Sequence, residues 1–193
     1  MNETITLDDL IAKLKAPDDK VRAAAWSAAG PLGAAAVKPL AALAADPASE
    51  LEVGRSAKRA LWKIVRHAGR PGGEADAKQA VVSELLCLLT DDRPLQFRRD
   101  VLWMVSEIGG DSCVAAAAKQ LKQKDLAEDA RCCLQRIPGE KSLAALRSGL
   151  AAADGNLKSA IAESLRARGV AVPDVPSQRL VPTKPTSVKP VGR

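Results

Sequence analysis

The stretch that decides the fold is GAAAVKPLAALAADPASELEVGRSAKRALWKIV, residues 33–65. Its second half begins at Val53 and places apolar side chains four, seven, eight and eleven positions later, at Ala57, Ala60, Leu61 and Ile64. These offsets fall on one face of an α-helix. Its first half carries apolar residues at similar spacing, at Val37, Leu40 and Leu43. Asp46-Pro47 lies between the halves and is typical of a turn before a helix. The stretch therefore predicts two consecutive helices joined by a short turn.

The apolar pattern after Val53 occurs at four other places, beginning at Val21, Phe97, Leu126 and Leu157, although Ser164 and Arg168 interrupt the last copy. The five starting residues are 32, 44, 29 and 31 positions apart, so three intervals suit a repeat of two helices and the longer one contains an insertion. A second apolar set at helical spacing precedes each copy, beginning at Leu10, Val37, Val81, Val114 and Leu143. No run of five or more residues alternates in the manner of a strand. We therefore expect an all-α protein of about five helix pairs.

Two short motifs give this repeat a family resemblance. From Gly33 the chain reads Gly-x-x-Ala-Val-x-Pro-Leu-x-x-Leu-x-x-Asp-Pro, and from Asp18 it reads Asp-x-x-Val-Arg-x-x-Ala. Residues 6–170 thereby resemble HEAT repeats of the armadillo type, in particular the short form of about 30 residues found in phycobilin lyases. The resemblance implies a right-handed α-α superhelix, or solenoid, in which the anchored helices line the concave side. The chain departs from the motif where Arg22 and Arg98 are matched by Gly54, Ala127 and Lys158 in the other copies, and Pro39 indicates that its helix begins near it or bends.

Segments rich in Gly and Pro interrupt the repeat region in its middle and mark its C-terminal end. Gly69-Arg70-Pro71-Gly72-Gly73 predicts a loop or insertion near residues 69–75. Residues 171–193 contain five prolines and no helical apolar pattern, and they carry four basic residues and one acidic one from residue 172 onward. Such a segment buries too little apolar surface to offset the entropy of ordering it. The prediction is a solenoid over residues 1–170 followed by a disordered, Pro-rich, basic tail over 171–193.

The net charge of +6 is concentrated in one predicted helix and the tail. Residues 51–72 contain six basic side chains and one acidic one, whereas residues 73–171 contain fourteen of each. In the predicted helix the arginines lie opposite the apolar face, beside Trp62. Arginine forms forked hydrogen bonds with phosphate or carboxylate, and tryptophan provides a stacking surface. The hypothesis is an anion-binding or partner-binding surface made of Arg55, Arg59, Trp62, Arg66, Arg70, Arg22, Arg98 and Arg99. The alternative is an ordinary solvated helix face.

The residues that catalysis requires are scarce. The chain has one His, no Tyr and no Gly-rich phosphate loop, and its four Cys show no metal-ligand spacing. We therefore expect no enzyme activity, no metal and no cofactor. Two alternatives come from the fold resemblance alone. Asp100 and Trp103 with their neighbouring arginines suggest an alkylpurine DNA glycosylase, and the repeat subtype suggests a phycobilin lyase or bilin carrier.

The function predicted from these observations is a protein-interaction scaffold or adaptor that uses the concave surface of a small HEAT solenoid. The alternative is a module that binds nucleic acid or another polyanion. No apolar run is long enough to span a membrane, and the acidic N-terminus does not resemble a signal peptide, so we expect a cytoplasmic protein with no membrane partner. The partner, the pathway and the oligomeric state stay open.

Overall fold

The computed structural model of the chain describes residues 5–89 and 92–177. These residues form ten α-helices and two short 3-10 helices, η1 (Gly30–Ala36) and η2 (Asp111–Cys113), and contain no strand. The α-helices are α1 (Leu7–Leu14), α2 (Asp19–Ala28), α3 (Val37–Ala45), α4 (Leu51–Ala68), α5 (Ala75–Cys87), α6 (Leu95–Ile108), α7 (Val114–Gln120), α8 (Ala127–Arg136), α9 (Glu140–Ala152) and α10 (Gly155–Ala167). The all-α prediction is confirmed, and each of the ten apolar segments corresponds to one helix.

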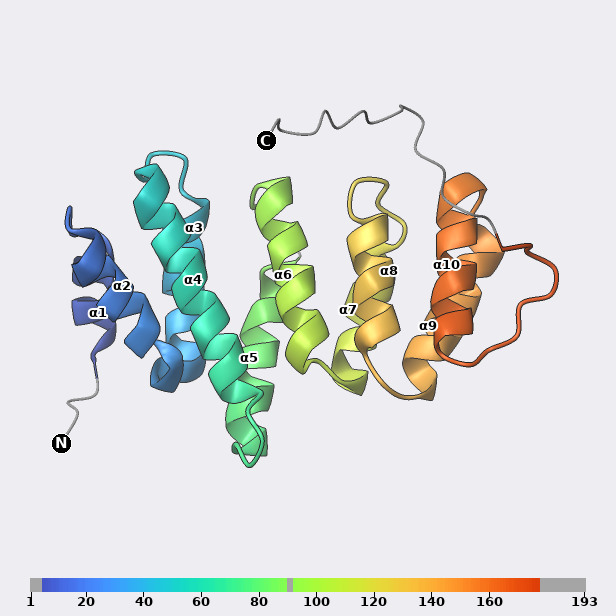
Figure 1. Cartoon of the computed structure of the whole chain (residues 1–193), viewed down its shortest axis with the longest axis horizontal. Coiled ribbons are helices and arrows are strands. Elements are labelled where there is room, and N and C mark those ends of the chain that lie inside the picture. Colours follow the sequence, from blue (N-terminus) through green and yellow to red (C-terminus); the bar gives the residue numbers. More distant parts are fainter. Residues whose placement is uncertain (1–4, 90–91, 178–193) are drawn as a thin grey trace, which may run out of the picture.

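The helices pack as consecutive pairs that follow one another along the molecule. Each even-numbered helix packs against its own predecessor and against the next even-numbered helix, in the order α2, α4, α6, α8, α10. Figure 1 shows these five helices side by side across the molecule, with the odd-numbered helices largely behind them. We call the row formed by α2, α4, α6, α8 and α10 the even layer. The five segments that share the apolar template thus lie together in one layer.

The template also identifies the core within the even layer. Ala57, Ala60, Leu61 and Ile64 of α4 are fully buried. Among the five starting residues, Val53, Phe97 and Leu126 are buried, whereas Leu157 is half-buried and Val21 is 38% exposed. The two exceptions belong to the first and last helix pairs. A terminal pair has a neighbour on one side only, so part of its apolar face remains accessible to water.

The insertion near residues 69–75 consists of a long helix and a loop. Helix α4 has 18 residues and continues to Ala68, and the chain then crosses residues 69–74 to reach α5. Gly69 lies against Ile108 at the end of α6, so closely that a Cβ atom at Gly69 would be 2.4 Å from Cγ2 of Ile108. Pro39 lies in the first turn of α3, where a missing backbone N–H costs no helical hydrogen bond.

The first part of the predicted tail has defined contacts. Gly169 has φ of +78°, a conformation that suits glycine, and the Val170 N–H then donates to the Leu165 carbonyl, which ends α10 in the usual way. Val170 and Val172 pack against the core. Figure 1 shows the chain turning back beside α10 after this point. Residues 178–193 lie outside the described residues, so disorder there stays a prediction.

Within residues 5–89 and 92–177, no single helix is long and apolar enough to cross a membrane. The bent combination of α2 with Gly30–Ala45, which meets at 81°, reaches that length and apolar content only when its two parts are taken together.

Candidate functional site

Helix α4 carries the predicted basic cluster and lies between α2 and α6 in the even layer. On the side toward α6, its cations are neutralised by acidic residues of that helix. Lys58 Nζ lies 2.8 Å from Asp100 Oδ2, and Arg66 Nε lies 3.4 Å from Glu107 Oε2. These pairs are partly exposed, so each contributes less than about 1 kcal/mol to stability. Their main electrostatic effect is to cancel charge along the α4–α6 seam.

On the side toward α2, the cations of α4 meet an aromatic ring instead. The guanidinium carbon of Arg59 is 6.0 Å from the ring centroid of Trp26, and Lys63 Nζ is 5.5 Å from it. Both cations are exposed, and neither forms an ion pair with any described residue. A cation–π contact orients a cation without cancelling its charge. Two positive charges are therefore held in place and available at the α2–α4 seam.

The two ends of α4 use their arginines locally. Arg55 Nη1 donates to Glu52 Oε1 at 2.6 Å, and this bond holds the pKa of the Glu52 carboxyl below its usual value. At the other end, Arg70 Nη1 donates to the His67 carbonyl at 2.5 Å. Trp62 lies under Arg66, with 5.0 Å between the ring centroid and the guanidinium carbon. Of the predicted arginines on α4 and just after it, only Arg59 forms no hydrogen bond or ion pair with a carboxylate or backbone carbonyl in the described part of the chain, although its charge also contributes to the lowered pKa of Glu52.

A second group of polar contacts joins α6 to α8. Asp129 Oδ1 accepts a hydrogen bond from Trp103 Nε1 at 3.0 Å, and Asp129 Oδ2 lies 3.5 Å from Arg99 Nε. Arg99 also donates to the Asp125 carbonyl. The Trp103 ring is 38% exposed and has the Arg136 guanidinium carbon 5.9 Å from its centroid. This seam combines a ring, two cations and one carboxylate, so Asp129 balances the charge of Arg99, whereas Arg136 forms no ion pair with a described residue.

The eight predicted surface residues do not form one continuous patch. Arg22 Nη1 donates to the carbonyls of Ala16 and Pro17, both at 2.7 Å, and so stabilises the turn between α1 and α2. The Nε atom of Arg98 is buried and has no hydrogen-bond partner within residues 5–89 and 92–177. Arg99 is bound to α8, as described above. Of the other five residues, four lie on α4 and Arg70 follows its C-terminal end, and their cations divide between those with and those without a carboxylate or carbonyl partner.

The cations over Trp26 and Trp103 come from the neighbouring helix and not from the helix that carries the ring. In the structure the cations over Trp26 come from α4, and the cation over Trp103 comes from α8. Lys63 and Arg136 were therefore missed. The repeat contains a signal for them. Lys63 lies ten positions after Val53, and Arg136 lies ten positions after Leu126. In both cases the preceding copy of the template carries the tryptophan.

The residues considered for catalysis have structural surroundings. Asp100 is paired with Lys58, and its side chain is 21% exposed. Burial raises the pKa of the Cys133 thiol to about 12 and also raises the pKa of Cys132, which disfavours the reactive thiolate. Within the described residues, no group of three or more His, Cys, Asp or Glu is placed to hold a metal ion.

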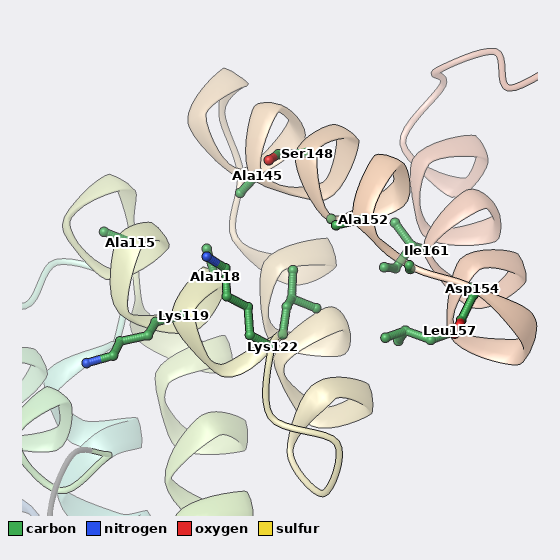
Figure 2. A pocket seen from close by; sticks show the side chains of 13 residues that line it. Ala115, Ala118, Lys119, Lys122, Ala145, Ser148, Ala152, Asp154, Leu157 and Ile161 are labelled. Atoms are coloured by element: carbon green, nitrogen blue, oxygen red, sulfur yellow. The ribbon is translucent and has the colours of Figure 1, made fainter.

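Two hollows lie near the C-terminal end of the molecule. The first, of about 660 Å³, is bordered by α7, α9 and the start of α10 (Figure 2). Figure 2 shows Ala118 and Lys122 on one side of it and Leu157 and Ile161 on another. The second, of about 910 Å³, lies between the N-terminal halves of α8 and α10 on the even layer. Leu121 and Leu157 line both hollows, so the two meet at this apolar pair.

The sequence was also compared with known proteins. No family model matches it, and no curated protein is significantly similar to it. What the structure establishes is therefore an all-helical protein with ten α-helices in its described part, packed as sequential pairs.

Proposed function

We propose that the chain is a protein-interaction module built as a small HEAT-type solenoid of five helix pairs, with the even layer as its inner, concave surface. The serial packing of the even-numbered helices supports this proposal, because it produces one extended surface made of similar helices. Its described surface is formed mainly by ring–cation contacts and ion pairs between neighbouring helices. Such a surface suits binding over an extended area.

The observation that carries the proposal is the pair of cations held over Trp26. Arg59 and Lys63 are exposed, oriented by the ring and unpaired with any described carboxylate. A carboxylate from a partner would gain two charge-assisted contacts at a site that is already ordered. We therefore propose that the partner is a protein that presents an acidic segment to the α2–α4 seam.

Nucleic acid is the second candidate, because Arg beside Trp also suits a phosphate backbone with stacked bases. The charge distribution favours a protein. Binding along a nucleic acid requires several phosphate contacts in a row. Beyond α4, the row of cations along the even layer is interrupted by the acidic residues Asp100, Glu107 and Asp129. The uncompensated charge is local, which fits a short acidic segment better than a long polyanion.

The test compares an acidic peptide with a single-stranded oligonucleotide of similar charge, both fluorescently labelled, by anisotropy titration at fixed salt. The variant Arg59→Ala/Lys63→Ala is expected to lose roughly tenfold or more in affinity for a poly-glutamate peptide, because two charge-assisted contacts disappear. The matched control is Lys78→Ala/Lys158→Ala, which removes two exposed cations of α5 and α10 and keeps the net charge equal. Circular dichroism confirms that both variants remain helical.

The outcomes separate the candidates. Equal loss in both double variants contradicts a specific α2–α4 site and indicates general charge attraction. Tighter binding of the oligonucleotide than of the peptide, with the same dependence on Arg59 and Lys63, favours the nucleic-acid candidate. Purification of partners from native extract with and without nuclease then identifies which class is retained in the cell.

A further inference from the structure

The residues after α10 form a strap that runs back along that helix. We define the C-terminal strap as residues 168–177. Arg166 Nη2 donates to the Val172 carbonyl at 2.8 Å and also to the Val175 carbonyl, and Ser177 Oγ donates to Glu163 Oε1 at 2.7 Å. As the strap residue number rises, the partner on α10 moves from Arg166 to Glu163. The strap is therefore directed toward the N-terminal end of α10 (Figure 1).

The larger hollow begins where the strap ends. Glu163, which holds Ser177, is one of the residues that line the groove of about 910 Å³ between α8 and α10. The next lining residues along α10 are Ala160 and Ser159, about one turn further toward the N-terminus, and Asn156, about two turns further. A chain that continues in the direction of the strap therefore enters this groove.

The floor of the groove suits apolar side chains. It is formed by Leu121, Ala127, Leu157 and Ala160, and Leu121 and Leu157 are only half-buried. At the end of the groove opposite Glu163 lies Asp154, which is exposed and forms no ion pair with any described residue. The groove thus offers an apolar surface that leads to an available carboxylate.

The sequence that follows the strap matches this surface. Residues 178–193 contain four basic residues and no acidic one, and Leu180-Val181 is the only pair of adjacent large apolar residues in them. The seven residues from Glu163 to Asn156 span about 10 Å along the helix, which an extended chain covers in about three residues. Leu180 and Val181 follow Ser177 at three and four positions, so an extended chain is just long enough to bring them to the apolar floor.

We propose that residues 178–181 continue the strap into the α8–α10 groove of the same molecule, with Leu180 and Val181 covering its apolar floor and Arg179 close enough to pair with Asp154. The tail then shields the C-terminal end of the even layer. This inference concerns a different surface from the proposed acidic-partner site and does not depend on it.

The test uses the full chain and two-dimensional amide NMR. Leu180→Asp/Val181→Asp is expected to shift the backbone amide signals of Ala127, Leu157 and Ala160, because a charged pair leaves the apolar floor. The matched control Val188→Asp/Val191→Asp introduces the same charge beyond the reach of the groove and is expected to leave those three signals at their wild-type positions. Neither variant alters a described residue, so the fold is preserved in both.

Two outcomes would overturn the inference. If the three signals coincide in all three proteins, the tail does not occupy the groove. If the wild-type signals move toward those of the Leu180→Asp/Val181→Asp variant on dilution, the tail that fills the groove comes from a second copy. Unchanged wild-type positions over the dilution series, together with the variant-specific shift, support docking within one molecule.

Discussion

The α2–α4 seam and the α6–α8 seam use similar residues, but a carboxylate pairs with a cation only at the second seam. Each has a partly exposed tryptophan on its first helix and a cation from its second helix over the ring. At the α6–α8 seam, Asp129 also bonds the indole and pairs with Arg99. At the α2–α4 seam, no described carboxylate pairs with Arg59 or Lys63. The presence of tryptophan and arginine therefore does not define a binding surface. What matters is whether a neighbouring helix supplies the counter-charge.

The largest expected effect on stability concerns the contact between Gly69, at the end of α4, and Ile108 of α6, which lies between the two seams. Gly69→Ala brings a Cβ atom against Ile108 of α6, and Gly69 has φ of −85°, so the clash and not backbone strain is the cause. We expect the free energy of unfolding to fall by about 1–3 kcal/mol in urea titrations, as for other overpacked sites. Gly110→Ala is the control, because a Cβ there meets nothing within 4 Å. Equal stability of the two variants would show that α4 and α6 are not closely packed at this point.

The second prediction concerns the pH dependence of the free energy of unfolding. The described α2–α4 region contains no cysteine, whereas α8 contains the buried Cys133. The pKa of Cys133 is raised to about 12 from 9.0, so the folded chain keeps a proton that the unfolded chain loses. This stabilisation is fully present below pH 9 and decreases as the pH rises through the interval from 9 to 12, by up to about 1.4 kcal/mol per pH unit. Urea titrations of reduced wild type and Cys133→Ala at pH 8 and 10 measure it. Parallel losses in both proteins would contradict it.

The smallest expected change in stability comes from removing a carboxylate that pairs with a cation between α4 and α6. Asp100→Asn removes the charge that pairs with Lys58 and is expected to cost less than about 1 kcal/mol, because the pair is partly exposed. Affinity for the poly-glutamate peptide should nevertheless rise, since Lys58 joins Arg59 and Lys63 as an available cation. The control is Asp111→Asn, which releases Lys141 of α9 and leaves the pairs between α4 and α6 intact. A rise in both variants would show that total charge, and not the arrangement at α4, determines binding.

Much of the helical arrangement was accessible from the sequence because it depends on periodicity. The apolar offsets of four, seven, eight and eleven residues identified the five even-numbered helices, and the apolar sets before them identified the odd-numbered ones. The apolar face of Ala57, Ala60, Leu61 and Ile64 is fully buried. The template was less informative at the ends of the repeat, where Val21 is 38% exposed. Periodicity specifies which face of a helix is apolar, but burial of that face depends on a neighbour that the terminal pairs have on one side only.

At the candidate site, the sequence predicts which residues are charged but not which charges are paired. The sequence by itself determined that α4 carries an excess of positive charge and that tryptophan and arginine recur in the template. Only the tertiary structure decided which of these charges remain available. Lys58 and Asp100 are 42 positions apart in sequence, and Arg99 and Asp129 are 30 apart, so their pairing depends on how neighbouring helices are placed side by side. Charge is a property of the residue, whereas compensation of charge is a property of the distance between residues, which packing alone determines.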